Sequence, residues 1–450
     1  MKMMLNDSLS PRMWKSITLL VALVGVALGS VLKSPDTPLE KDSWALLIAG
    51  SNGYDNYRHQ ADICHSYHVM IAEGIPANRI VVMMYDDIAY SHENPTPGVI
   101  INKPNGTNVY AGVKIDYKGD DVNPLNFINV LKGNKTGMHG IGTGRVIESD
   151  ENTNVFVYFS DHGSTGLLAF PNDILTADDL EATLKEMHKA NSYNKLFMYI
   201  EACEAGSMFE NILEENTRVY VMTAANRDET SAAWYCTDNC LGDEFSVRWM
   251  ERLDGENKGT LDQFFHQYQQ LRPKVTESHI QIYGDFSLGT DALTPNNKAS
   301  RSSMESSSGD HVAVNSRDVP LYYYQQKLAR TNDMDSQMKA QQDLDQLIEG
   351  RKSADQLLEK LVTLATIDNP EKTAIVSGKR MPINLDIFPC YKKLLHSFRS
   401  HCFEHKHAYL LQHYYKLANI CVLGLDTSRL LREMPSLCAP LKAELKTTVL

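Results

Sequence analysis

The chain has 450 residues, of which 22% are charged, and its formal net charge at pH 7 is −12. An acidic chain lacks the excess of Lys and Arg that binding to nucleic-acid phosphates requires, so we expect no nucleic-acid partner. The sequence contains no nucleotide-binding loop, no metal-binding motif and no internal repeat. We therefore expect neither a cofactor nor a metal.

Residues 1–29 predict a secretory signal peptide. Lys2, Arg12 and Lys15 precede the apolar run 17–28, which closes on small residues, and this order is typical of such signals. The alternative is an uncleaved membrane anchor, because apolar character continues a few residues further. The run is nevertheless short for a bilayer span of about 20 residues. We expect cleavage, entry into the secretory pathway and no stable membrane anchor.

Between residues 44 and 283, strand patterns alternate with helix patterns. The predicted strands are 44–49, 80–85, the runs that begin at 155 and 196, and 219–223; the predicted helices are 57–73, 125–131, 177–189 and 208–213. Such alternation predicts an α/β fold with a mostly parallel sheet and helices on both faces. The long Pro-, Gly- and Asn-rich stretch 86–121 predicts surface structure. In a secreted chain, Asn105 and Asn134 are predicted glycosylation sites.

Two predicted strands lead to side chains that can react together. Segment 155–163 (VFVYFSDHG) ends near His162, and segment 196–206 (LFMYIEACEAG) ends near Cys203. The carboxyl ends of neighbouring parallel strands meet at one edge of a sheet, so we expect the two side chains to lie side by side. An imidazole can accept the proton of a thiol and so make it a nucleophile. The alternative is a buried structural cysteine, since free cysteine is among the most buried residue types.

The motifs YFSDHGSTG and YIEACEAGSMF resemble those of the legumains, the asparaginyl endopeptidases related in fold to caspases. The resemblance extends from SWALLIAGSNGYDNYRHQAD to the cysteine-bearing C-terminal third. It implies a caspase-like sheet followed by a small all-α prodomain stapled by disulfides. It also implies a cysteine endopeptidase that cleaves after Asn, and after Asp at acidic pH, through a thioester.

The resemblance implies roles for individual residues. Cys203 would be the nucleophile, His162 the general base and later acid, and Asn56 the residue that positions the imidazole. The backbone N–H groups of Gly163 and Cys203 would form an oxyanion hole, worth about 3 kcal/mol per donor. The specificity pocket would be lined by Arg58, His59, Glu201, Ser231 and Asp243. Such polar side chains suit a carboxamide, which presents both an acceptor and donors.

Three residues depart from the usual family pattern. Ser160 stands where Thr is common, Ala205 where Ser is common and Arg227 where Pro is common. None of them removes a proposed catalytic group, although Arg227 could reshape the substrate wall. Asp161 could either tune the neighbouring imidazole or cap the loop, and the sequence leaves both readings open.

Eight cysteines are present, and disulfides persist in the secretory pathway. Cys236 and Cys240 could bridge across a short loop, as similar loops do in plant legumains. In the tail we take Cys390–Cys421 and Cys402–Cys438 as candidate pairs, although the sequence leaves their connectivity open. Cys64 lies on a helical pattern and predicts a buried structural thiol, and Cys203 would remain free.

The predicted organisation is a signal peptide 1–29, a catalytic domain 30–290, a linker or activation peptide 291–332 and a helical prodomain 333–450. Residues 294–318 are polar and Ser-rich, so we expect them not to fold. Helices are predicted at 334–348, 354–364 and 392–403.

The catalytic part with its linker and the C-terminal part differ in net charge. Residues 30–332 hold 25 Lys and Arg against 41 Asp and Glu (net −16), whereas residues 333–450 hold 16 against 14 (net +2). The two parts are complementary at neutral pH. The resemblance implies that the tail is an intramolecular inhibitor released at low pH after cleavage at Asn332, which could itself be held in the pocket. The alternative is a permanent regulatory or adhesive module.

Other functions remain to be weighed against the endopeptidase. A transpeptidase or ligase would use the same thioester and pass the acyl group to an amine. The transamidase subunit of GPI attachment is disfavoured, because it would carry a membrane anchor and no disulfide-bearing tail, and a catalytically dead binding protein is disfavoured by the presence of both Cys203 and His162. Expected partners are protein and peptide substrates and cystatin-type inhibitors, in a lysosome, an endosome or another acidic lumen.

Overall fold

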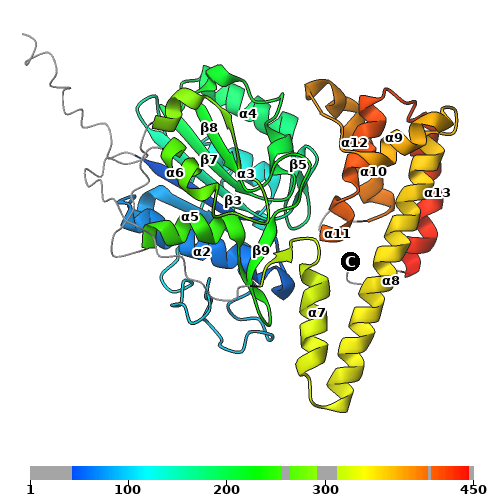
Figure 1. Ribbon diagram of the computed structural model, residues 1–450. Helices are drawn as coiled ribbons and strands as arrows, with labels where there is room; N and C mark the ends of the chain where they lie inside the picture. The colour runs from blue at the N-terminus through cyan, green and yellow to red at the C-terminus, as the bar shows by residue number, and fades with distance from the viewer. Residues whose placement is uncertain (1–42, 255–263, 291–311, 404–406, 445–450) are drawn as a thin grey trace, which may run out of the picture. The chain divides into compact units, whose positions relative to one another are not determined.

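The computed structural model describes residues 43–254, 264–290, 312–403 and 407–444 (Figure 1). The predicted signal peptide and residues 291–311 of the predicted linker lie outside these ranges. Within them, none of the helices combines the length and the apolar character that a membrane span needs.

A six-stranded sheet forms the centre of the catalytic part, with the strand order β11-β8-β7-β3-β1-β2. Its strands are β1 (Trp44–Ala49), β2 (Ile80–Met83), β3 (Asn154–Ser160), β7 (Lys195–Glu201), β8 (Val219–Thr223) and β11 (Gln281–Gly284). Neighbouring strands run parallel except for the edge strand β11, which is antiparallel to β8. The inner strands are almost wholly buried because both sheet faces are covered. The predicted fold class is confirmed.

Helices cover both faces of this sheet (Figure 1). On one face, α3 (Pro124–Leu131) and α4 (Ala177–Lys189) pack against every second strand residue, such as Leu46 and Val157. On the other face, α2 (Tyr57–Ala72), α5 (Glu244–Asp254) and α6 (Phe264–Leu271) pack against the alternate residues. This alternation is the two-residue period of a strand buried on both sides.

Several smaller elements were not predicted. A meander of β4 (Gly163–Ser164), β5 (Leu167–Ala169) and β6 (Ile174–Thr176) follows the histidine, and the hairpin β9 (Ala232–Cys236) and β10 (Cys240–Asp243) pairs with β12 (Val314–Asn315). The predicted helix 208–213 is wrong: a short 3-10 helix, η5 (Ala205–Met208), is followed by turns. Asn211 has a left-handed φ of 60°, which a continuous right-handed helix cannot contain.

The C-terminal part is helical, as predicted. Its helices are α7 (Val319–Arg330), α8 (Met334–Ala365), α9 (Thr373–Gly378), α10 (Phe388–His401), α11 (Ala408–Leu411), α12 (Tyr414–Val422) and α13 (Ser428–Glu444). The predicted helices 334–348 and 354–364 are one continuous helix, because Gly350 is buried against its neighbours and does not interrupt it. Helix α10 begins four residues earlier than predicted, since the first turn of a helix accepts a proline.

Three disulfides are present in the described part of the chain: Cys236–Cys240, Cys390–Cys421 and Cys402–Cys438. The last two link α10 to α12 and to α13, so they hold the prodomain helices together. Cys64 is a buried thiol whose Sγ lies 3.8 Å from the sulfur of Met84, in keeping with a structural role.

The prediction that residues 294–318 do not fold is wrong for the end of that segment. Val314 and Asn315 form β12, and Ser316 and Arg317 are buried. Local composition predicted a linker because these residues have few apolar side chains. Their order comes instead from backbone pairing with β9 and from the ion pair of Arg317 with Glu204.

Candidate active site

The ends of β3 and β7 bring the two reactive side chains to one edge of the sheet. Ser160 and Glu201 are paired at the ends of these strands, and the Asp161 N–H donates to the Glu201 carbonyl at 3.1 Å. His162 and Cys203 each follow two residues after the paired strand ends. Gly163 lies so close that a Cβ atom there would be 2.4 Å from the Cys203 carbonyl oxygen. Only glycine fits at this position.

Asn56 determines the tautomer of His162. The amide nitrogen of Asn56 donates to the Asn52 carbonyl at 3.0 Å, so its Oδ1 faces the imidazole and accepts from His162 Nε2 at 2.9 Å. His162 Nδ1 is then left with its lone pair, and it makes no hydrogen bond within the described residues. Burial lowers the pKa of His162 well below its ordinary value, and the charges of Arg58 and Arg317 lower it further. The ring is a neutral base.

Cys203, the predicted nucleophile, is covered in this structure. Cys203 is buried, and its Sγ lies 3.7 Å from Ser231 Oγ. Burial raises the pKa of the Cys203 thiol, although the charge of Arg317 opposes this rise. The cysteine is therefore a protonated thiol here, which is a poor nucleophile.

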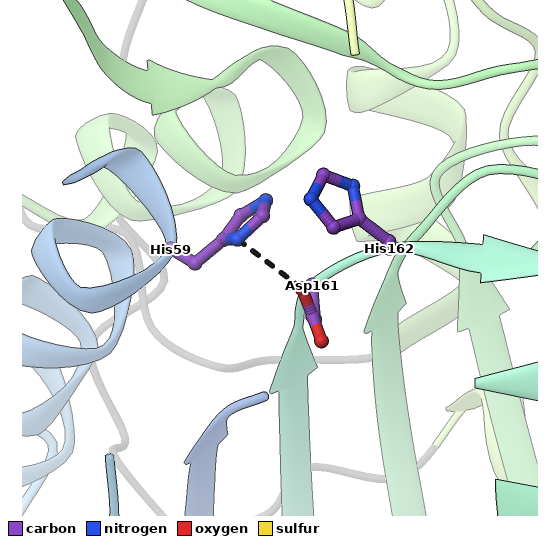
Figure 2. Close-up of side chains that lie close together, drawn as sticks. All are labelled: His59, Asp161 and His162. Atoms are coloured by element: carbon purple, nitrogen blue, oxygen red, sulfur yellow. Dashed lines mark ion pairs between the residues drawn. The ribbon is translucent and has the colours of Figure 1, made fainter. Parts of the chain in front are cut away.

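Asp161 faces the pocket histidine, and its carboxylate also accepts a hydrogen bond from the backbone at His162, in keeping with the loop-capping reading of the sequence. Figure 2 shows His59 of α2 and His162 with their rings turned toward each other and Asp161 at the end of β3 beside them. The Asp161 carboxylate lies 3.4 Å from His59 Nδ1, and the two rings are 5.0 Å apart at 83°. Asp161 thus positions His59, whose Nδ1 also contacts Ser51 Oγ at 2.6 Å.

The same three residues have the composition of a metal site. One ligand atom from each of His59, Asp161 and His162 lies within 4.8 Å of the others. Burial lowers the pKa values of both histidines, and the positive charge of Arg58 lowers them further. The same charge would repel a divalent cation. We assign the cluster to the peptidase site.

All five residues of the predicted specificity pocket are buried: Arg58, His59, Glu201, Ser231 and Asp243. Arg58 Nε donates to Asp243 Oδ1 at 2.9 Å. Glu201 Oε2 accepts from the backbone N–H and the hydroxyl of Ser246 at 3.0 and 2.8 Å. Three polar atoms of this set, Arg58 Nη2, Glu201 Oε1 and Asp243 Oδ2, make no hydrogen bond within the described residues. Buried polar atoms without such partners are costly and mark a place for a polar ligand.

Asp62 is a pocket residue that the sequence reasoning missed. It is fully buried, its Oδ2 accepts from the Asp243 N–H at 3.3 Å, and its Oδ1 accepts from Asn102 at 2.7 Å. Burial and the neighbouring Asp243 raise the pKa values of both Asp62 and Glu201 well above the ordinary range. The available signal was its spacing, since Asp62 follows Arg58 by four residues on one helix face.

A strand from the activation segment crosses the site. Val314 pairs with Ala233 and Asn315 with Ala232, and the Ser316 N–H donates to the Ser231 carbonyl at 3.1 Å. Arg317 Nη2 donates to the Gly163 carbonyl and to Glu204 Oε2, the latter at 2.8 Å.

Glu204, the residue after Cys203, also binds a prodomain cation. Its second carboxylate oxygen accepts from Arg380 Nη2 at 2.5 Å. Neither Glu204 nor the two arginines were singled out from the sequence, because three chain segments far apart in sequence meet there.

The remaining residues named from the sequence differ in their positions. Asn332 is exposed between α7 and α8 and does not lie in the pocket. Arg227, one of the departures from the family pattern, pairs with Glu210 and Asp228 at 3.3 Å each. Ser160, another departure, donates to Asp62 Oδ2 at 3.3 Å.

A thiol, a neutral imidazole with a fixed tautomer and an orienting amide at the carboxyl edge of a parallel sheet define a cysteine peptidase. Residues 43–299 match the model of the Peptidase C13 family, and residues 342–438 match that of the legumain prodomain. The chain belongs to the Peptidase C13 family, and it is a cysteine endopeptidase with a prodomain. The expectation drawn from the motifs is confirmed.

Curated relatives match along nearly their whole length. Legumain of Homo sapiens is 40% identical over 94% of this chain and 99% of its own. The vacuolar-processing enzyme delta-isozyme of Arabidopsis thaliana is 40% identical over 91% of this chain and 92% of its own. The hemoglobinase of Schistosoma mansoni is 35% identical over 90% of this chain and 94% of its own. Among solved structures, caspase-1 from Spodoptera frugiperda is similar over 54% of this chain and 87% of its own, with 11% identity and a TM-score of 0.32.

Removing the amide of Asn56 should slow the reaction. We expect Asn56→Ala to lower kcat by about 10- to 100-fold with little change in KM, because the imidazole loses the partner that holds its tautomer and orientation. Steady-state kinetics on a peptide substrate measure the effect. Asn108→Ala, which removes a loop amide that bonds to Ile100 and Gly98, is the matched control and should keep the wild-type kcat. An unchanged kcat in Asn56→Ala would show that His162 needs no orienting partner.

Proposed function

We propose that the chain is an asparaginyl endopeptidase, made as a zymogen and opened in acid. The observation that carries this proposal is the set of buried polar atoms without hydrogen bonds in the pocket, Arg58 Nη2, Glu201 Oε1 and Asp243 Oδ2. They belong to residues beside the nucleophile: Glu201 precedes Cys203 by two positions, and Ser231 links the pocket to its sulfur.

An asparagine side chain matches this set of atoms. Its carboxamide oxygen accepts from Arg58 Nη2, and its nitrogen donates to Asp243 Oδ2. An ionised aspartate would instead place a second acceptor against Asp243. Protonation converts that oxygen into a donor, so aspartate substrates should be accepted at acidic pH.

The proposed chemistry uses the side chains described above. The thiol proton of Cys203 passes to His162 Nδ1, and the sulfur attacks the carbonyl carbon of the substrate. Backbone N–H groups of Gly163 and Cys203 stabilise the oxyanion. The imidazolium then protonates the leaving amine and a thioester remains, which water hydrolyses with His162 again as base. An amine that reached the thioester first would give transpeptidation instead.

The prodomain would act as the inhibitor. Arg317 of the activation segment donates to Glu204 beside Cys203, and Arg380 of the prodomain donates to the same carboxylate. Two further sets of ion pairs join basic prodomain residues to the acidic catalytic part: Lys392 with Asp178 and Asp179, and Arg399 with Asp173, each at 2.7 Å. These contacts follow the charge complementarity expected from the sequence.

Histidines are the groups that would make this closed state sensitive to acid. Burial lowers the pKa of His413 to about 4 and that of His162 well below its ordinary value. A histidine with a depressed pKa stabilises the closed state above pH 6.5, and this stability is lost as pH falls toward the depressed value.

Some carboxylates weaken the closed state as pH falls, and others strengthen it. Although burial raises the pKa of Glu93, hydrogen bonds from Tyr323 and Lys327 bring it below its ordinary value. The stability that Glu93 gives to the closed state is therefore also lost in acid. Burial raises the pKa of Glu204 despite its two arginines, so Glu204 favours the closed state as pH falls. Basic and hydroxyl partners thus outweigh burial at Glu93, whereas burial outweighs the two arginines at Glu204.

We also propose an acidic compartment for the enzyme and glycosylation at two asparagines. An enzyme opened by acid would act in an acidic compartment of the secretory pathway, such as a lysosome or endosome. Asn105 and Asn134 are exposed in surface loops, where glycosylation is sterically possible.

Acid should open and cut the zymogen. We expect the full-length chain to be inactive near pH 7 and to cut itself after Asn332 at about pH 4 to 5, where histidines are charged and carboxylates titrate. Mass spectrometry of the new C-terminus after incubation across this pH range identifies the cut. Asn332→Ala should block it, although cleavage at Asp333 could replace it slowly, whereas Asn384→Ala, an exposed prodomain asparagine, should be cut like the wild type. An intact chain that is fully active at pH 7 would exclude an inhibitory tail.

A further inference from the structure

We propose that Glu204 determines specificity for the residue that follows the scissile bond, and that the enzyme favours Arg or Lys there. The inference rests on the proposed asparaginyl endopeptidase function and concerns the leaving-group side of the same site.

The first step is the register of the chain's own strand in the site. β12 pairs antiparallel with β9, and the Ser316 N–H extends this pairing to the Ser231 carbonyl. Ser316 Oγ lies 3.3 Å from Ser231 Oγ, which is itself 3.7 Å from Cys203 Sγ. Ser316 therefore occupies the position of a substrate residue beside the nucleophile.

The pocket next to this position is not filled. A serine side chain is too short to satisfy the pocket, and Arg58 Nη2 and Asp243 Oδ2 make no hydrogen bonds within the described residues. An asparagine in the place of Ser316 would extend into the pocket. Residues 314–317 thus mark the path of a substrate that carries Asn at the third of these positions.

The next residue then marks the leaving-group side. Arg317 is 3% exposed, and its guanidinium donates to the Gly163 carbonyl and to Glu204 Oε2. It therefore bridges the loop that carries the base and the loop that carries the nucleophile. A substrate residue after the scissile bond would reach the same carboxylate.

The backbone holds Glu204 in place. Glu204 has a left-handed φ of 50°, and its N–H donates to the Glu229 carbonyl at 2.8 Å. Its own carbonyl accepts from the hydroxyl of Ser207 at 2.6 Å. We therefore expect the carboxylate to keep its position when Arg317 and Arg380 leave with the inhibitory segments.

Departure of the two arginines would leave Glu204 without its cationic partners. A carboxylate that has lost its partner in a partly buried site gains from a new cation, and a substrate Arg or Lys provides one. Charge-assisted hydrogen bonds of this kind favour the paired substrate by about tenfold. A ligand with a glutamate at the same position would be repelled.

The test uses three internally quenched peptides that differ only after the asparagine, which is followed by Arg, Gln or Glu. Enzyme activated in acid from the full-length chain is assayed between about pH 5 and 8, because burial raises the pKa of Glu204 and the preference requires its ionised form. We expect kcat/KM to fall in the order Arg, Gln, Glu, with an Arg-to-Gln ratio of about ten that decreases as salt is added.

Variants identify the residue responsible. Glu204→Gln should bring the Arg-to-Gln ratio to about one, whereas Glu210→Gln should preserve it, because Glu210 pairs with Arg227 and not with Arg317. The ratio within one variant does not depend on how much enzyme has folded. Equal cleavage of all three peptides by the wild type would overturn the inference and leave the proposed function intact. Cleavage of none of them would overturn the proposed function itself.

Discussion

We expect Cys203→Ala to abolish cleavage of asparagine peptides, with a loss of about 10⁴-fold or more in kcat. The substitution removes the sulfur that we propose forms the thioester, while the proposed oxyanion hole and pocket would retain the small catalysis that binding alone supplies. The purified full-length variant should also stay uncut after Asn332 at acidic pH if the cut is autocatalytic.

The matched control for this variant is Cys64→Ala. Cys64 is the other free cysteine of the described residues, and its sulfur contacts Met84 rather than a polar group. We expect Cys64→Ala to retain activity at the cost of a modest decrease in melting temperature. Peptide hydrolysis and thermal unfolding, measured for both variants, separate a loss of catalysis from a loss of stability. Residual hydrolysis above about one percent in folded Cys203→Ala would place the nucleophile elsewhere.

The second large effect is expected in the specificity pocket. Arg58→Ala removes the donor that we assign to the carboxamide oxygen, and it leaves the buried carboxylate of Asp243 without its ion pair. Sites built to hydrogen-bond a polar substrate lose about 10²- to 10⁴-fold when that pairing is broken. We therefore expect kcat/KM for asparagine peptides to fall by at least about 100-fold.

Loss of activity alone would not separate recognition from unfolding, because breaking a buried ion pair also destabilises the fold by about 3–5 kcal/mol. The readout is therefore the ratio of kcat/KM for peptides with Asn and with Ala before the scissile bond. Arg145→Ala, which removes the partner of the buried Asp116 far from the site, should be less stable yet keep the wild-type ratio. If Arg58→Ala lowered both substrates equally, Arg58 would support the fold without reading the carboxamide.

The central sheet and the reactive pair were predictable because they depend on local patterns. β1 and β8 match their predicted bounds, since each is a short apolar run that stops at polar residues. The motifs around His162 and Cys203 follow adjacent parallel strands, so the order of the strands along the chain was enough to place them at one edge. The three disulfides of the described residues were among the candidate pairs, but the sequence left the connectivity of the tail open.

The contacts that control the site could not be predicted in the same way. Asp161 pairs with His59, more than 100 positions away in the chain, and the fold alone decides which side of the loop its carboxylate faces. Residues 312–318 look like a polar linker, but Val314 and Asn315 form a strand because β9 offers them backbone partners, and Glu204 offers a counter-charge to Arg317. Composition reports what a segment can bury by itself and is silent about partners supplied by distant segments.

The sequence by itself determined the family, the α/β catalytic part with its helical tail, and the pairing of a thiol with an imidazole. These rest on runs of residues whose periodicity and order along the chain carry the information. Only the tertiary structure decided that Ser316 lies beside the nucleophile, that Glu204 holds two arginines from different segments, and that Asp62 lies against the pocket. Each of these depends on partners far apart in sequence: backbone pairing for Ser316, ion pairs for Glu204, and burial beside Asp243 for Asp62.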